Sequence, residues 1–283
     1  MSDFFEALRD PDIPFLRYAL LAGVLASIAM GIIGTYVVTR RISYIAGAIS
    51  HSVLGGIGAA LWLQTVVGWT WCDPMAAAVV AALASALTIG LVSLYAKQRE
   101  DTVIGAIWAV GMAVGLLFFA KTPGYTDPMS YLFGNILMIA PGDLWHVVEL
   151  DVLVVGLGVL FYHKFLAVCF DQEFAELRGV RVKVYYLLLL CLTALCVVLL
   201  VRVVGIVLVI AMLTLPAAIA GHFSRRLWEM MILASLGCMV CTVAGLAVSY
   251  HYEAPTGPVI VVLAAAGYLA VAAGHRLRSK SIG

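Results

Sequence analysis

Two groups of polar side chains that can bind metal interrupt an otherwise apolar sequence. His51 lies in the segment IAGAISHSVLGGIG, flanked by two serines, about nine residues or ~13 Å into an expected helix. His251 and Glu253 lie in SYHYEAPTGP, just before two prolines and a glycine that end a helix. Imidazole nitrogen and carboxylate oxygen suit a borderline divalent metal such as zinc. We therefore expect these three residues to be metal ligands.

Each group also has a structural alternative. A buried histidine can bond to a carbonyl group of a neighbouring helix, and a His–Glu pair at the end of a span can be a polar cap. The depth of His51 and the glycines that follow it favour a metal ligand or a proton carrier that lines a path. For His251 and Glu253 alone the two interpretations are about equally good. Together with His51 in the same bundle, a metal path is the better interpretation.

Other polar residues are weaker candidates. Asp73 directly precedes Pro74 and is better explained as the N-cap of a helix that starts with proline. Asp127 lies in the loop TPGYTDPMS, where it either contacts an external partner or is simply solvated. Three further residues cluster near one end of an expected span, as vestibule or interface residues: His146, Glu149 and Asp151.

The composition identifies a membrane protein. Of the 283 residues, 64% are hydrophobic and 12% are charged, whereas a soluble domain has about 45–50% and about 25%. A spanning helix needs roughly 20 mainly apolar residues. We predict an all-α bundle, a single transmembrane domain over residues 1–283, with about nine spans: 15–38, 43–64, 74–96, 102–120, 144–162, 184–202, 204–222, 228–250 and 258–274. The apolar stretch 132–139 is too short to cross and is expected to be re-entrant or interfacial.

The basic residues predict the orientation of the bundle. With the N-terminus outside, 13 of the 17 Lys and Arg residues lie in the inner loops and the C-terminal tail. The positive-inside rule therefore places the N-terminus outside and the C-terminus in the cytoplasm. In this arrangement residues 163–183 form the one sizeable cytoplasmic segment. They are either a solvated loop or a short helix that docks on a cytoplasmic protein, with Gly179 as a helix stop.

Several function classes are excluded. The sequence contains no HExxH, GxSxG or GxxxxGK[ST] motif, so the chain is not expected to be an enzyme or to bind ATP itself. Its net charge of +1 gives no field that would gather nucleic acid. Cys238 and Cys241 form a CxxC inside an apolar run, and we interpret them as packing residues. Any uphill transport must draw its energy from a gradient or from another subunit.

Four segments carry a resemblance to a known family. They are RRISYIAGAISHSVLGGIG at 40–58, YLFGNILMIAPGDL at 131–144, VGIVLVIAMLTLPAAIAGHFS at 204–224 and SYHYEAPTGPVIVV at 249–262. In this order along nearly the whole chain, they resemble the membrane permeases of bacterial ABC importers for zinc, manganese and iron, which have a type II importer architecture. The cytoplasmic DQEFAELRGVRV is similar to the family's acidic–x–x–x–A–x–x–x–G pattern.

The resemblance implies the partners and the cargo. It implies a second permease copy in a homodimer, two cytoplasmic ATP-binding cassette subunits and an external metal-binding protein, all at the bacterial inner membrane. The cargo is a divalent metal that is transported rather than held as a cofactor. The ATPase contact is expected at four residues: Asp171, Glu173, Ala175 and Gly179. The external protein is expected to dock near residues 121–130, which include Asp127, and near 251–257.

The sequence departs from the family pattern at one position. The motif around the second span usually has an aspartate four residues before the histidine, and here Gly47 stands at that position. Positions i and i+4 share a helix face, so an oxygen donor is missing beside His51. Because manganese prefers oxygen donors and zinc accepts nitrogen, the difference leans toward zinc. The alternative function is a proton-coupled secondary metal transporter that needs no ATPase.

Overall fold

The computed structural model describes residue 8 and residues 14–95, 100–124, 128–134 and 141–280, and all regular structure in these ranges is helical. The helices are α2 (Pro14–Thr39), α3 (Ser43–Trp62), the π-helical turn η1 (Leu63–Val67), α4 (Pro74–Tyr95), α5 (Glu100–Lys121), α6 (Pro128–Phe133), α7 (Pro141–Leu160), α8 (Tyr162–Phe170), α9 (Gln172–Leu177), α10 (Val182–Val204), α11 (Ile206–Phe223), α12 (Leu227–Tyr252) and α13 (Thr256–Lys280). This confirms the all-α prediction.

The long helices match the predicted spans. In the described ranges, eight helices are long and apolar enough to cross a bilayer. A ninth span requires α7 and α8 together, and these two helices are bent by 73° where they meet. The bend at Phe161 means that α8 leaves the direction of α7 instead of continuing it. The orientation of the bundle across the bilayer remains a prediction from the basic residues.

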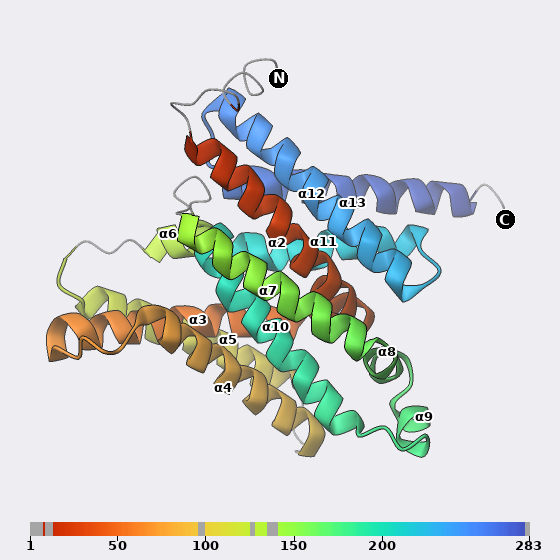
Figure 1. Ribbon diagram of the computed structural model, residues 1–283, viewed down its shortest axis with the longest axis horizontal. Helices are drawn as coiled ribbons and strands as arrows, with labels where there is room; N and C mark the ends of the chain where they lie inside the picture. Colours follow the sequence, from red (N-terminus) through yellow and green to blue (C-terminus); the bar gives the residue numbers. More distant parts are fainter. Residues whose placement is uncertain (1–7, 9–13, 96–99, 125–127, 135–140, 281–283) are drawn as a thin grey trace.

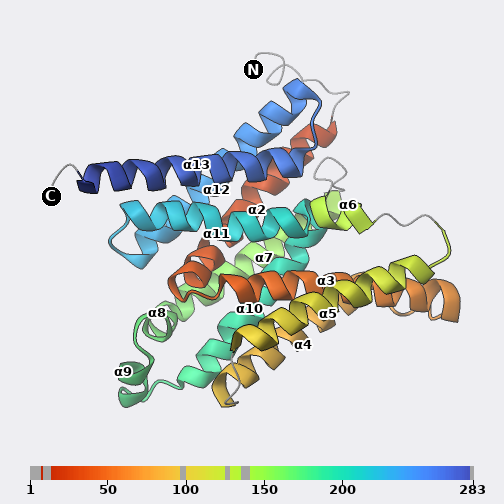
Figure 2. The ribbon, with the colours of Figure 1, turned by 180° about the vertical axis from the view of Figure 1, so that it is seen from behind.

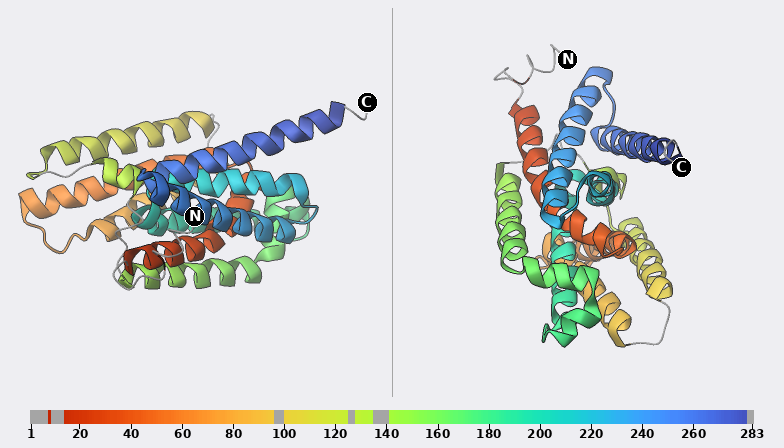
Figure 3. Two further views of the ribbon diagram at one scale, coloured as in Figure 1. Left: turned by 90° about the horizontal axis from the view of Figure 1, so that it is seen from above. Right: turned by 90° about the vertical axis from the view of Figure 1, so that its right-hand side faces the viewer.

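The helices form two groups that α10 joins. On one side α3 packs against α4 and α5, and on the other α2 packs against α7, α11 and α12. Helix α10 contacts members of both groups, running diagonally behind α7 in the first view (Figures 1 and 2). Helix α13 lies at the outside of the bundle against α11 and α12, and its C-terminal end projects beyond them (Figure 3). Helix α3, which carries His51, is therefore an interior element.

Small residues allow the helix backbones to touch. A Cβ atom added at Gly34 of α2 would overlap the carbonyl oxygen of Leu213 in α11, and one at Gly31 would overlap Ser235 of α12. In lipid, helices associate through such close contacts because the hydrophobic effect does not drive them together. At these positions small residues therefore allow compact packing of the bundle.

Helices α10 and α11 are joined by a single residue. Gly205 is the only residue between them and has φ 84°. Residues other than glycine rarely adopt this backbone conformation. The predicted spans 184–202 and 204–222 also left a single residue between them, but placed the break at Val203, which lies inside α10. Gly134, just after α6, meets Gly205 at backbone contact. Protein therefore covers the backbone of the described part of the 132–139 stretch, as a short apolar segment at membrane depth requires.

The glycine contacts of α2 give a stability prediction. We expect Gly34→Ala to destabilise the protein by about 1–3 kcal/mol, because the added methyl group forces α2 and α11 apart. Thermal unfolding in detergent would show this as a lower Tm. The matched control is Gly105→Ala in α5, where nothing lies within 4 Å of an added Cβ atom. An equal loss of Tm in both variants would contradict the packing role of Gly34.

Candidate metal site

His51 lies in the most deeply buried of the long helices. Arg41, with φ 62°, turns the chain after α2, and α3 follows as a run of small and aliphatic residues with most of its side chains buried. The side chain of His51 is 8% exposed. The histidine is therefore inside the protein, at the face of α3 that meets α5. This agrees with the depth expected from the sequence.

An aromatic side chain covers the imidazole ring. The indole of Trp108 in α5 stacks on His51, with 4.7 Å between ring centroids and 25° between planes. Among the described residues, the Nδ1 atom of His51 is buried and has no hydrogen-bond partner. A buried nitrogen that lacks a partner costs about 1–3 kcal/mol, so this nitrogen is open to a proton or a ligand. Within the described ranges Nδ1 makes no bond to a carbonyl group of a neighbouring helix.

The hydroxyl groups beside His51 are already in use. The Oγ atom of Ser50 donates to the carbonyl oxygen of Ala46 at 2.8 Å, and that of Ser52 donates to the carbonyl oxygen of Ile49 at 2.7 Å. Both are local bonds to the helix's own backbone, a common state for serine inside a helix. The hydrogen of each hydroxyl group is therefore donated to the helix backbone, and neither serine donates a hydrogen bond to the imidazole.

Glycines hold α3 and α5 at backbone distance. A Cβ atom at Gly55 would lie 2.9 Å from the carbonyl oxygen of Gly111, and one at Gly58 would lie 2.8 Å from that of Gly115. We call these four residues the α3–α5 seam. Trp108 precedes Gly111 by about one helical turn, and so the seam brings its indole directly over His51. Trp108 was not among the candidates predicted from the sequence. Its position in the middle of a span, rather than at an end, is the feature that could have identified it.

The other two candidate ligands lie at the turn between α12 and α13. Glu253 ends α12 with φ 50°, and its exposed side chain lines a hollow of about 510 Å³ that α2 also borders. The hydroxyl groups of Ser249 and Thr256, 2.8 Å apart, tie the two helices together across this turn. His251 is exposed and packs edge-on against Tyr252 rather than lining the hollow.

The three candidate ligands are not gathered in one protomer. In the described part of the chain, no group of three or more His, Cys, Asp and Glu side chains could hold a metal. Helices α12 and α13 pack on α2 and α11, and neither has an extensive contact with α3. Any path that uses all three residues must therefore present them one after another. Asp127 lies outside the described residues.

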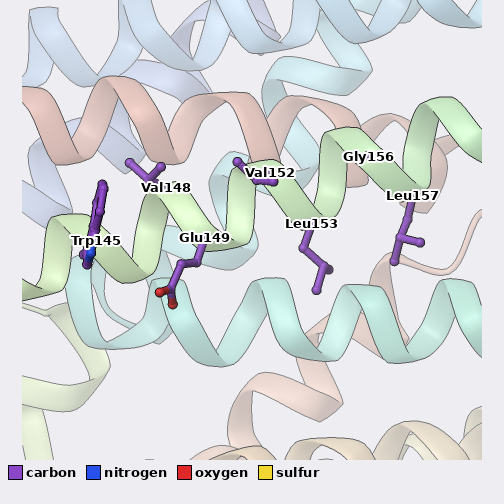
Figure 4. Close-up of a pocket in the computed structure, with 7 residues that line it drawn as sticks. All are labelled: Trp145, Val148, Glu149, Val152, Leu153, Gly156 and Leu157. Carbon is purple, nitrogen blue, oxygen red and sulfur yellow. The ribbon is translucent and has the colours of Figure 1, made fainter.

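The weaker candidate residues lie in different surroundings. Asp73 accepts a hydrogen bond from the backbone N–H of Ala76 at 2.9 Å, which confirms it as an N-cap. His146 and Glu149 are exposed on α7 with Nδ1 and Oε2 3.4 Å apart. Glu149 also lines a hollow of about 600 Å³ whose described walls all come from α7, as Figure 4 shows. Asp151 is buried instead, and accepts a hydrogen bond from the backbone N–H of Ala29 at 3.1 Å.

The predicted partner segment contains a short helix. Asp171 caps α9 by accepting a hydrogen bond from the N–H of Phe174 at 2.9 Å, and Gly179 follows α9 with φ 76°. The helix stop predicted at Gly179 is confirmed. Ala175 is buried, whereas Glu173 is exposed. The exposed side includes Phe174 and Leu177, and Leu177 is 86% exposed.

Comparisons with known proteins agree with this architecture. The model of the ABC 3 transport family matches residues 12–274. A probable metal transport system membrane protein of Chlamydia pneumoniae is 42% identical over 251 residues, 88% of this chain and 85% of that protein. The manganese transport system membrane protein MntC of Listeria monocytogenes is 34% identical over 88% of this chain and 87% of its own. The solved structure of PsaBC from Streptococcus pneumoniae, in complex with Fab, superposes with a TM-score of 0.83 at 29% identity, covering 95% of this chain and 94% of that one.

The cap of α9 gives a second prediction. We expect Asp171→Ala to weaken α9 by about 1 kcal/mol, because the N–H of Phe174 loses its acceptor, whereas Asp171→Asn keeps a side-chain oxygen and changes stability by a few tenths. Amide hydrogen exchange over residues 172–177 would report the difference. Equal exchange rates in the two variants would show that the side-chain oxygen at position 171 does not order the helix.

Proposed function

The chain belongs to the ABC 3 transport family and is the membrane permease of a metal importer, and we propose that its cargo is zinc, rather than manganese or iron. In this proposal an external metal-binding protein delivers the ion, and the permease passes it to the cytoplasm. ATP is hydrolysed by a separate subunit. The observation that carries the choice of zinc is the buried Nδ1 atom of His51, which has no hydrogen-bond partner among the described residues.

The donor set near His51 supports the choice of metal. An imidazole nitrogen is available there, and the neighbouring serine hydroxyl groups are bonded to their own helix. Zinc accepts nitrogen ligands readily, whereas manganese prefers oxygen. The name of the Listeria relative assigns manganese to that protein; a different preference is proposed here because Gly47 supplies no carboxylate beside His51.

The separation of the three ligands supports a path of successive weak sites. The ion would first meet Glu253 and His251 at the exposed turn between α12 and α13, and later His51. A conducting site must bind weakly enough to release its ion, and single ligands meet this requirement better than a cluster of three. We propose that the path lies between two permease copies in a homodimer. The external protein would dock at the turn 251–257 and at the loop that contains Asp127.

The segment 163–183 is proposed to receive the force from the ATPase. Helix α9 exposes Phe174 and Leu177, and α8 anchors it to the bundle through the buried side chains of Phe165 and Val168. Tyr36 of α2 packs edge-on against Phe165 with ring centroids 5.3 Å apart. A displacement of α9 would therefore reach the helix that leads into α3. In this proposal Asp171 and Gly179 shape the contact, and Glu173 belongs to its exposed side.

The role of His51 can be tested by uptake. We expect His51→Ala to reduce zinc uptake by about 10–100-fold in a reconstituted transporter, because the path loses a metal ligand. Assembly with the ATPase subunit should be unchanged. The control is Ser50→Ala, whose hydroxyl group bonds only its own helix and whose loss should leave uptake near the wild-type rate. Wild-type uptake by well-assembled His51→Ala would refute the assignment.

The energy source can be tested in the same vesicles. A permease that is driven by ATP should move zinc only when the ATPase subunit and ATP are present. A proton-coupled secondary transporter would instead move zinc with a pH gradient and no partner. Transport by the permease alone under a pH gradient would overturn the ATP-driven mechanism.

The exposed side of α9 can be tested by binding. We expect Leu177→Glu to lower the fraction of permease that co-purifies with the ATPase subunit, because a charge replaces apolar surface at the contact. The matched control is Phe223→Glu, which places the same charge at the end of α11, just beyond the predicted span 204–222, at a position that is 66% exposed and lies outside the segment 163–183. Equal loss of the ATPase in both variants would contradict a specific docking surface on α9.

A further inference from the structure

We propose that Trp108 is a specificity-determining residue of the metal path. By filling the space above Gly47 and stacking on His51, its indole keeps oxygen donors away from the imidazole and disfavours manganese. This inference rests on the proposed function, because it assumes that His51 meets the transported ion. It adds a residue of α5 to the selection of the ion and explains why position 47 carries a glycine.

The indole of Trp108 lies directly against Gly47. A Cβ atom added at Gly47 would overlap the Cζ3 atom of the indole and lie 2.7 Å from Cη2. Gly47 precedes His51 by four residues, and positions i and i+4 lie on the same helix face. Any side chain at position 47 would therefore occupy the space that the indole now fills. The indole and a side chain at position 47 exclude each other.

Close backbone contacts keep α5, which carries Trp108, next to α3. The α3–α5 seam holds the two backbones together, and a Cβ atom at Gly111 would lie 2.7 Å from the Cα atom of Ser52. The contacts that α5 makes with α3 therefore hold the backbone of Trp108 beside His51. Its ring stacks on the imidazole with a 25° angle between planes, which also holds the orientation of the imidazole.

Few side-chain atoms near His51 can bind a metal ion. The Nδ1 atom of His51 has no partner, and the hydroxyl groups of Ser50 and Ser52 are bonded to backbone carbonyl groups. Within the described ranges, no cluster of His, Cys, Asp or Glu side chains includes His51. The ion would therefore meet a nitrogen donor and an aromatic face at this depth. Such a site favours zinc over manganese, which binds best to oxygen.

The exchange of the indole for a carboxylate tests the proposal directly. Zinc and manganese binding would be measured by equilibrium dialysis on four purified permeases: wild type, Gly47→Asp, Trp108→Ala and the double variant. We expect the double variant to bind manganese at least about tenfold more tightly than Gly47→Asp, since the indole in that single variant keeps the carboxylate away from His51. The zinc affinity should change less. An unchanged ratio of manganese to zinc affinity between these two variants would overturn the proposal.

Selectivity in transport is the second readout. Vesicles that contain the permease, its ATPase and its binding protein would receive equimolar zinc and manganese. The double variant should take up a larger share of manganese than Gly47→Asp alone, because the indole in the single variant keeps the carboxylate away from His51. The same share in both variants would count against the proposal.

A thermal test separates the packing claim from the transport claim. We expect Gly47→Ala to lower the Tm in the wild-type background and to have little effect in Trp108→Ala, because the overlapping ring is then gone. The control is Gly56→Ala, whose added Cβ atom would lie 2.6 Å from the carbonyl oxygen of Ala77 in α4. It should lower the Tm in both backgrounds. If Gly47→Ala has the same effect in both backgrounds, Trp108 does not occupy the space above Gly47.

The combination of results distinguishes the two proposals. If the wild-type protein binds and transports no metal, the proposed function fails even when the thermal test confirms the contact between Gly47 and Trp108. If metal transport depends on His51 but neither the affinity ratio nor the uptake share responds to the exchange, only the role of Trp108 fails.

Discussion

The close approach of helix backbones in lipid is the constraint on which this structure depends. Apolar side chains gain little by meeting one another in a bilayer, and so the helices are held by contacts that only small residues permit. The α3–α5 seam is the clearest case, and Gly34 against Leu213 is another. The same constraint sets the space beside His51, because the distance between α3 and α5 decides how much room remains there for the proposed metal path.

Much of the fold could be predicted from the sequence because each span must satisfy its own backbone in lipid. Eight of the nine predicted spans, the cap at Asp73 and the helix stop at Gly179 follow from local properties and are confirmed. The bend between α7 and α8 was not predicted, since no proline or glycine marks Phe161. The single residue between α10 and α11 was predicted as a tight connection, but the apolar run did not identify Gly205 as the turn.

The candidate site was only partly visible in the sequence. The depth of His51 followed from helix geometry alone. The cover that Trp108 provides depends on which helix packs against α3, and such a contact between residues far apart in the chain leaves no local pattern. The sequence also placed His251 and Glu253 with His51 in one path, yet the structure holds them on helices that do not pack together. Their order along a path therefore depends on the assembled transporter and not on one protomer.

The one-residue connection at Gly205 has a mechanical consequence. A longer loop would act as slack and let α10 tilt while α11 stayed in place, but a single glycine at backbone contact with Gly134 leaves no free length. Helix α10 begins shortly after α9, the short helix that is proposed to contact the ATPase, and it contacts both halves of the bundle. Because α10 and α11 are joined without a loop, a tilt of α10 would also move the start of α11.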